Sequence, residues 1–295
     1  MNRYAIIEAP SILGLKPTGV DRLPSALLQH GLADQLHARH AGRVAPAAAY
    51  DAKRDPQTLM LNAPGIAEYS LQLADVVADI VGRGEFPILL GGDCSIVLGS
   101  MLALRRRGRY GLLFIDGHAD FYQPEALSSG EAASMDLAFA TGRGPEVLTN
   151  LEGLRPLVRD EDVVAFGFRD AQEQREYGSQ PLPRELLALE LSEVRRLGAK
   201  PAAQRAVEHL TAADKSTQGF HIHLDADVVS DALMPAVDYR MADGLSWDQL
   251  CIVLQTALAS GRAVGLEVTI YNPALDADGS SGRELARTLI KALQS

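Results

Sequence analysis

The chain alternates short apolar runs with longer amphipathic stretches, and this alternation most constrains what it can fold into. A short run that is apolar throughout predicts a strand buried on both faces, as in a parallel sheet covered by helices. Such runs lie at residues 4–7, 86–90, 111–115, 163–166, 220–224 and 263–268. The amphipathic stretches between them predict helices at residues 66–81, 96–107, 183–197, 247–258 and 282–293.

Strand and helix alternate from end to end, which favours a single α/β domain over residues 1–295. The expected architecture is a doubly wound, mainly parallel central sheet with helices on both faces. Hydrophobic residues make up 47% of the chain, enough for a large core. No repeat, low-complexity linker or break in composition marks a domain boundary.

The charge balance excludes several kinds of partner. The formal net charge of -10 argues against nucleic acids and anionic membrane surfaces, because both select for basic patches. No apolar run reaches the roughly 18 to 20 residues of a membrane span, and the chain starts without a charged-then-apolar leader. We therefore expect a cytoplasmic protein in which Cys94 and Cys251 stay reduced.

Polar residues directly follow three of the predicted strands, at the position where doubly wound sheets bind ligands. Gly-Gly-Asp-Cys-Ser follows the strand at 86–90, Asp-Gly-His-Ala-Asp follows the strand at 111–115, and Asp-Ala-Asp follows the strand at 220–224. Each segment alone also fits aspartates that cap a helix or turn the chain. The coincidence of three such segments favours one shared site at one edge of the sheet.

Two of these segments carry groups that bind metal ions. Asp116, His118 and Asp120 alternate along the chain, which in an extended strand end directs all three side chains to the same side. Asp225 and Asp227 repeat this spacing with two carboxylates. Oxygen ligands with one imidazole suit Mn²⁺ or a similar divalent ion. The set exceeds what one ion needs and predicts two cations about 3.5–4 Å apart, which would also offset the repulsion among the carboxylates.

The three segments resemble the metal-binding motifs of the arginase, agmatinase and formiminoglutamase family, the ureohydrolases. The likeness continues across nearly the whole chain. Residues 14–31 resemble the family's N-terminal glycine-rich turn and helix, residues 167–170 its Gly-x-Arg motif, and residues 267–273 its last strand and turn. The resemblance implies the three-layer α/β/α arginase fold, a homo-oligomer such as a trimer or hexamer, and two Mn²⁺ ions per chain.

By the same resemblance, the protein is an amidinohydrolase that hydrolyses a C–N bond of a small guanidino or amidino compound. The nucleophile is a hydroxide that bridges the two metals, because the shared cations bring the pKa of bound water toward about 7. Asp120 would accept a hydrogen bond from this hydroxide, and Glu267 matches the family carboxylate that pairs with the substrate's guanidinium. The implied metal ligands are Cys94, Asp116, His118, Asp120, Asp225 and Asp227.

Cys94 departs from the family pattern, because most members have a histidine ligand at this position. Two outcomes stay open. A thiolate beside a cation binds Zn²⁺, Co²⁺, Ni²⁺ or Mn²⁺, so Cys94 can remain a ligand and shift the preference toward softer ions. Alternatively, Cys94 binds no metal and one of the two sites is weakened.

The loop after Asp120 departs as well. Ala133 stands where arginases have a proton-shuttling histidine, a kind of group worth about 10² to 10⁴ in rate. Ser129 and Glu131 fall in the segment that binds the amino-acid end of the substrate, and Glu131 replaces an asparagine there; a solvated loop glutamate is the alternative interpretation. Gln172 replaces an acidic residue that serves the α-amino group. We therefore expect a substrate other than arginine, such as a guanidino-amine.

Two rival functions remain. The first is an amide-cleaving hydrolase or deacylase on the same scaffold, since a metal-bound hydroxide attacks an amide as readily as an amidine. The second is a catalytically weak binding relative, which Cys94 and Ala133 suggest. The intact carboxylates argue against the second, because a binding module has no need for so many unpaired charges at one point.

Overall fold

An eight-stranded sheet forms the centre of the molecule in the computed structural model, which describes residues 3–294. The strand order is β2-β1-β3-β8-β7-β4-β5-β6, and all pairings within this sheet are parallel. The strands are β1 (Tyr4–Glu8), β2 (Arg39–Arg43), β3 (Phe86–Leu90), β4 (Gly111–Ile115), β5 (Val163–Phe166), β6 (Leu187–Leu189), β7 (Phe220–Asp225) and β8 (Ala263–Thr269).

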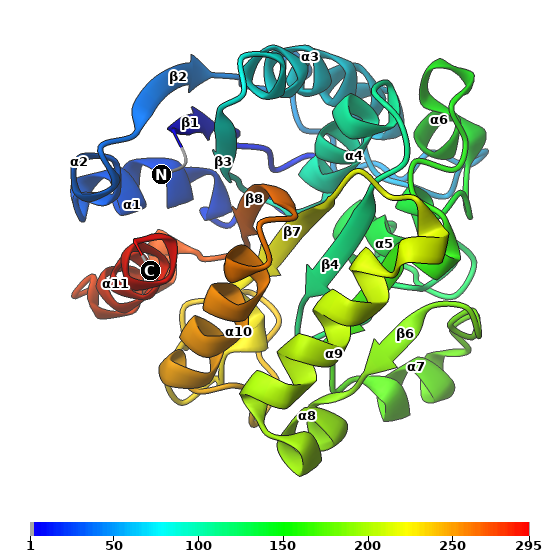
Figure 1. The fold of residues 1–295 in the computed structure, drawn as a ribbon. Coiled ribbons are helices and arrows are strands. Elements are labelled where there is room, and N and C mark those ends of the chain that lie inside the picture. Colours follow the sequence, from blue (N-terminus) through cyan, green and yellow to red (C-terminus); the bar gives the residue numbers. More distant parts are fainter. Residues whose placement is uncertain (1–2, 295) are drawn as a thin grey trace.

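Helices cover both faces of the sheet and complete a three-layer α/β/α fold (Figure 1). One face packs against α3 (Ala63–Gly82), α4 (Val97–Arg105), α5 (Asp136–Ala140) and α6 (Glu146–Thr149). The other packs against α1 (Leu23–Gln29), α2 (Leu32–Leu36), α8 (Leu191–Leu197), α9 (Ala199–Thr211), α10 (Trp247–Ala259) and α11 (Ser280–Leu293). Helix α7 (Ala171–Tyr177) follows β5.

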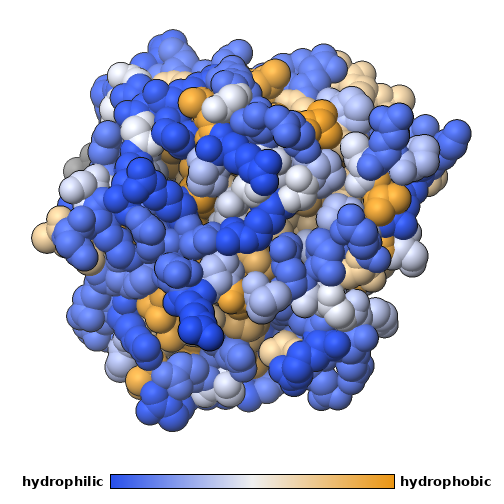
Figure 2. Space-filling model, turned by 90° about the vertical axis from the view of Figure 1, so that its right-hand side faces the viewer, coloured by the Kyte–Doolittle hydropathy of each residue, from blue (hydrophilic) through white to orange (hydrophobic). Residues whose placement is uncertain are grey.

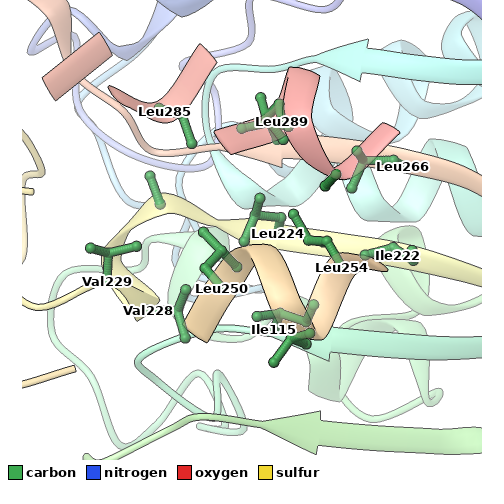
Figure 3. Close-up of a cluster of buried hydrophobic side chains, with 14 of the residues drawn as sticks. Ile115, Ile222, Leu224, Val228, Val229, Leu250, Leu254, Leu266, Leu285 and Leu289 are labelled. Atoms are coloured by element: carbon green, nitrogen blue, oxygen red, sulfur yellow. The ribbon is translucent and has the colours of Figure 1, made fainter. Parts of the chain in front are cut away.

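The two helical layers bury alternate residues of the same strands. Ile222 and Leu224 of β7 pack toward α10, where Leu250 and Leu254 meet them (Figure 3). On β4, Phe114 belongs to the opposite core. This alternation follows from the period of two in an extended strand, and it explains why the central strands read as continuous apolar runs.

The expected strands are all present, and four of the five expected helices correspond to α3, α4, α10 and α11. The helix expected at residues 183–197 is wrong, because β6 occupies part of it and only α8 is helical. Strand β6 pairs with β5 at the edge of the sheet. Strand β2 at the opposite edge was also not predicted, because its sequence Arg-His-Ala-Gly-Arg has no apolar run.

The face of the molecule in Figure 2 is mostly hydrophilic, and its apolar side chains are interrupted by polar ones. Among the helices of residues 3–294, none combines the length and apolar character that a membrane crossing requires.

The sheet brings the three polar segments to one edge. Strands β3, β8, β7 and β4 are consecutive neighbours, and their parallel direction places all four carboxyl ends together. The register pairs Asp225 with Thr269 and Ile115 with Leu224, so the ends of β4, β7 and β8 are level. The residues that follow these strands therefore face one another.

Candidate metal centre

The end of β4 supplies the first group of candidate ligands. Asp116 directly follows the strand and is 1% exposed, His118 is partly buried, and Asp120 is 6% exposed. The strand ends at Ile115 and the chain bends at residues 117–118, and Asp120 has a positive φ of 44°. The three side chains therefore lie beside one another in the loop after β4, and not along an extended strand end as the spacing predicted.

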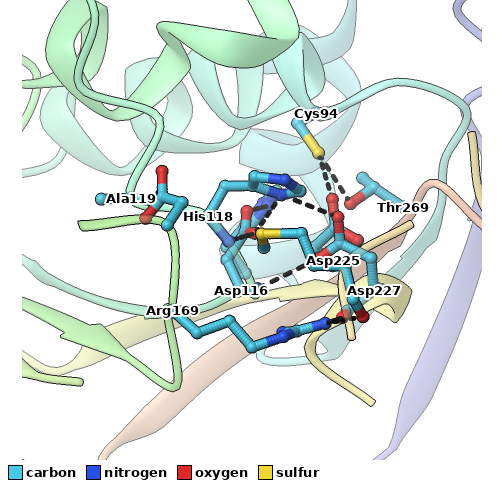
Figure 4. A network of polar contacts seen from close by, with 12 residues as sticks. Cys94, Asp116, His118, Ala119, Arg169, Asp225, Asp227 and Thr269 are labelled. Carbon is cyan, nitrogen blue, oxygen red and sulfur yellow. Dashed lines mark hydrogen bonds and ion pairs between the residues drawn. The ribbon is translucent and has the colours of Figure 1, made fainter. Parts of the chain in front are cut away.

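The end of β7 supplies the second group. Asp225 is the last residue of β7, and Asp227 lies in the single turn of 3-10 helix η7 (Ala226–Val228). The Asp225 carboxylate accepts a hydrogen bond of 2.7 Å from the backbone N–H of Asp227, which fixes the turn between them. Asp227 also lies 2.9 Å from Nδ1 of His118, and this contact joins the two strand ends (Figure 4).

Cys94 comes from the neighbouring β3 end and starts the short 3-10 helix η2 (Cys94–Ile96). Its Sγ lies 3.0 Å from Oδ2 of Asp225 and 3.2 Å from Oγ1 of Thr269 (Figure 4). Asp93 holds this loop in place, because its carboxylate accepts hydrogen bonds from Ser11 Oγ at 2.7 Å and from the backbone N–H of Ser95 at 2.9 Å. The thiol is therefore positioned among the aspartates by a fully buried hydrogen-bond network.

The site concentrates more negative charge than its own residues neutralise. Burial raises the pKa of Asp116 to about 6, and the neighbouring Asp227 adds to the rise. Burial followed by nearby aspartates also raises the pKa of Asp225 and of Asp120 well above the usual range. The pKa of the Cys94 thiol is raised for the same two reasons. Such a cluster is costly without cations, because buried like charges repel each other in a medium of low dielectric constant.

Divalent cations fit this arrangement. One group of close ligand atoms joins Asp116, His118 and Asp227, within 4.8 Å of one another. Two further groups within the same limit share the Cys94 sulfur. Among the described residues, the buried Oδ2 of Asp116 has no hydrogen-bond partner, as expected for an oxygen that binds a cation. The structure thus brings together all six residues predicted as ligands.

Asp136 is a site residue that the sequence did not reveal. It is the first residue of α5, it is 0% exposed, and one of its oxygens lies within 4.8 Å of ligand atoms of Cys94 and Asp120. In the part of the chain that is described, neither of its carboxylate oxygens has a hydrogen-bond partner. Burial and then Asp116 raise its pKa. A buried aspartate beside Cys94 and Asp120 adds one more potential ligand to that side of the centre.

A cavity of about 280 Å³ opens onto the centre. His118, Asp120, Asp225 and Asp227 form part of its wall, so a small molecule in it reaches the candidate metal ligands. None of the described residues in the wall is a lysine or an arginine. The other lining residues are Leu15, Tyr122, Leu127, Ser128, Ser129, Glu131, Ala133, Ser134, Glu173, Tyr177, Tyr239 and Ile270.

Comparison with known proteins decides the family. The sequence model of the Arginase family matches residues 2–294 of the chain. The chain belongs to the arginase family. It is 29% identical to the arginase of Bacillus caldovelox over 284 residues, covering 94% of this chain and 93% of that protein. It is 28% identical to the arginase of Brevibacillus brevis over 292 residues, covering 96% and 95%.

A solved structure of the arginase from Bacillus caldovelox superposes with a TM-score of 0.88 at 26% sequence identity, covering 100% of this chain and 99% of that one. The predicted α/β arginase-like fold with its parallel sheet is therefore confirmed. Membership of the arginase family makes the protein a metal-dependent hydrolase of the ureohydrolase type.

The structure corrects the expected role of Glu267 in this arginase relative. The side chain is 0% exposed and does not line the cavity; the nearby residue that does is Ile270. The Glu267 carboxylate accepts a 2.5 Å hydrogen bond from Ser100 Oγ and lies 2.6 Å from His223 Nδ1. Burial acts to raise the pKa of Glu267, but His221 and His223 outweigh it and lower the value to about 2. Glu267 therefore contacts the histidines of β7 and is not part of the described cavity wall.

The other two residues predicted to bind the substrate, Ser129 and Glu131, lie in the wall of the cavity. Ser129 lines the cavity, as expected for a residue near the substrate. Glu131 lines it too but is only 1% exposed, so it is not a solvated loop residue. Its carboxylate lies 3.0 Å from Lys16 Nζ and accepts a 2.5 Å hydrogen bond from the Tyr239 hydroxyl. The negative charge of Glu131 is thus partly compensated by Lys16.

Proposed function

We propose that this member of the arginase family hydrolyses a C–N bond of a small guanidino or amidino compound that carries a second positive charge and is not arginine. The observation that carries this proposal is the anionic wall of the cavity beside the metal centre. Glu131 and Glu173 line it outside the metal ligands, Lys16 compensates only Glu131, and the described lining residues include no lysine or arginine. A carboxylate on the substrate would meet repulsion there, whereas an amine would be attracted.

Two divalent cations per chain are part of this proposal. Asp116, His118 and Asp227 would hold one, and Cys94 with Asp120 would hold the other, with Asp116 within reach of both and Asp225 between Cys94 and Asp227. The carboxylates suit Mn²⁺, and the sulfur favours Zn²⁺, Co²⁺ or Ni²⁺ at the Cys94 side. When bound, such cations lower the pKa of a coordinated water toward about 7 and so supply the nucleophile.

The chain's own residues handle orientation and protons. Asp120 faces the cavity, and we assign it the hydrogen bond that orients the attacking water. Ala133 lines the same cavity but has no titratable group, so it offers no acid to the leaving nitrogen. Ser129 lines the same wall and can orient the substrate through its hydroxyl, and Tyr239 holds the Glu131 carboxylate in that wall.

Resemblance to the family supports two further proposals about how the protein works in the cell. We propose a homo-oligomer, a trimer or a hexamer, and a cytoplasmic location. Light scattering coupled to size-exclusion chromatography measures the first, and a monomer in that experiment would contradict it.

Amide cleavage is a second candidate function, and one observation favours it. The carboxylate expected to pair with a guanidinium, Glu267, lies outside the cavity wall, and the apolar Ile270 lies in that wall. A neutral amide makes no demand for a carboxylate partner at this position. A metal-activated water attacks an amide carbonyl by the same chemistry.

The deciding experiment combines metal analysis with product analysis. Elemental mass spectrometry on the reconstituted wild type is expected to give close to two ions per chain, falling in Cys94→Ser but not in Cys251→Ser. Cys251 is the matched control, because it is also a buried free cysteine but lies in α10. A panel of guanidino-amines, arginine and acylated amines is then assayed for urea and for carboxylate release.

Urea release from guanidino-amines in preference to arginine supports the proposal. Arginine as the best substrate would overturn the substrate assignment. Carboxylate release from acylated amines without urea would establish the second candidate. A wild type that binds no metal after reconstitution with Mn²⁺, Co²⁺, Ni²⁺ or Zn²⁺, and turns over nothing, would overturn both.

A further inference from the structure

His223 is a buried histidine whose Nδ1 contacts a carboxylate and whose Nε2 has no hydrogen-bond partner among the described residues. It lies in β7, two residues before Asp225, and is 0% exposed. Its Nδ1 is 2.6 Å from the Glu267 carboxylate, and its ring stacks on Phe114 with centroids 4.4 Å apart. These two contacts fix both the position and the orientation of the ring.

The other nitrogen points toward the metal centre. Nε2 of His223 lies 4.0 Å from Oδ2 of Asp116, which is too far for a hydrogen bond. Among the described residues, neither of these two buried atoms has a hydrogen-bond partner. A ring nitrogen of His223, a carboxylate oxygen of Asp116 and the sulfur of Cys94 all lie within 4.8 Å of one another. Three ligand-type atoms thus lie close enough together to bind one cation.

The contact with Glu267 sets which nitrogen is available. A neutral imidazole that donates its Nδ1–H to the Glu267 carboxylate at 2.6 Å carries its lone pair on Nε2. Histidines that bind metals generally donate their other N–H to a carboxylate or carbonyl, which orients the ring and raises its basicity. The Ser100 hydroxyl donates a hydrogen bond to Glu267, which fixes the carboxylate that contacts His223.

We propose that His223 binds, through Nε2, the same divalent cation as Cys94 and Asp116. This inference rests on the proposed function, because it requires that the cluster is a metal centre. The resulting ligand set of a thiolate, an imidazole and carboxylates favours Zn²⁺ or Co²⁺ over Mn²⁺ at this position. His223 would thereby supply the nitrogen ligand that Cys94 does not provide at position 94.

The test compares His223→Asn with His221→Asn. His221 is the matched control, because it lies in the same strand, is equally buried and contacts the same carboxylate, with Nε2 3.2 Å from Glu267 Oε2. It belongs to none of the groups of close ligand atoms found among the described residues. Both variants are titrated with Co²⁺, and bound metal is measured by elemental mass spectrometry alongside the sulfur-to-cobalt and d–d absorption bands.

We expect His223→Asn to lose about one ion per chain, or at least tenfold in affinity for it, with altered cobalt bands. His221→Asn is expected to keep both ions and the wild-type spectrum. Wild-type stoichiometry, affinity and cobalt bands in His223→Asn would overturn the ligand role while leaving the proposed function standing. A wild type that binds no cobalt would overturn the proposed function as well.

A crystal structure of the Zn²⁺-loaded wild type keeps the inference testable if His223→Asn does not fold. Nε2 of His223 at about 2.0–2.1 Å from a zinc ion confirms the ligand role. The zinc ion bound without His223, with Nε2 hydrogen-bonded to water or to Asp116 instead, refutes it.

Discussion

Ala133 leaves the cavity without an acid where a leaving group needs a proton. Its methyl group lines the cavity and is 8% exposed, so a longer side chain can extend into that space. We expect Ala133→His to raise kcat on a guanidino substrate by at least about tenfold, since a positioned general acid contributes about 10² to 10⁴. Steady-state urea release measures the effect. Ala133→Asn serves as the control for size, and equal rates for both variants would contradict the prediction.

Asp136 offers a test of the charge at the Cys94 side of the centre. Because burial and nearby acidic groups disfavour its ionised carboxylate, Asp136→Asn is expected to raise the unfolding midpoint of the metal-free protein at neutral pH. The same change should weaken metal binding, because it removes a negative charge near Cys94 and Asp120. Thermal unfolding in a chelator and a metal titration measure the two effects.

Asp162 is the matched control for that substitution. It is also 0% exposed, but its carboxylate accepts a 2.7 Å hydrogen bond from Nε of Arg109. Asp162→Asn should therefore destabilise the protein and leave metal binding unchanged. A lower midpoint of unfolding for metal-free Asp136→Asn than for the wild type would show that Asp136 has a stabilising partner after all.

The sequence predicted the site residues that directly follow the central strands. It did not predict how deeply other polar side chains are buried or which groups they contact. The grouping of Asp116, His118 and Asp120 at this edge followed from their position directly after a central strand. The position of Glu267 depends on which side of β8 faces the cavity and on two histidines from β7, and sequence spacing contains neither. For His223 a signal existed, because it shares a strand face with Asp225; its free nitrogen appears only after packing.

At the scale of elements, the loop between β3 and η2 packs its backbone closely against Ser11, in the segment that follows β1. A Cβ added to Gly92 would lie 1.9 Å from the carbonyl oxygen of Ser11. We expect Gly92→Ala to lower the free energy of unfolding by more than about 3 kcal/mol and to reduce metal binding, because the loop positions Cys94. Denaturant unfolding and metal analysis measure both.

Gly84→Ala is the control for that substitution. Gly84 has a positive φ of 68° but no heavy atom within 4 Å of the added Cβ, so only backbone strain of about 1–2 kcal/mol is expected. Similar losses for the two variants would mean that the contact with Ser11 relaxes easily.

The elements that sequence reasoning missed are edge elements. Strand β2 is polar and partly exposed, as edge strands often are, because exposed apolar edges promote aggregation. Strand β6 has three residues and lies within a stretch whose leucines also fit a helical period. A continuous apolar run identifies strands buried on both faces, such as β4. An edge strand forms because it pairs with the adjacent strand, and its own sequence pattern does not reveal this.

At the scale of the whole molecule, a net charge of -10 coexists with a buried acidic centre, so cations should stabilise the entire fold. A metal that binds only the folded state at 100 times its Kd contributes about 2.7 kcal/mol per site. Chelation should therefore lower the Tm of the wild type, as measured by calorimetry. An unchanged Tm would show that the centre needs no cation for stability.

The stability of the metal-free protein should depend on pH, and the pKa of Asp116 sets the direction. Folding raises the pKa of Asp116 from its ordinary value of 3.8 to about 6, so its charged form is disfavoured in the folded state. The stability of the metal-free protein therefore falls as pH rises through this window and stays low above it. The loss of Tm on chelation should be larger at about pH 7 than at about pH 4.5. Asp116→Asn should show a flatter pH dependence in the chelator, and a metal-free wild type that is more stable at the higher pH would contradict this account.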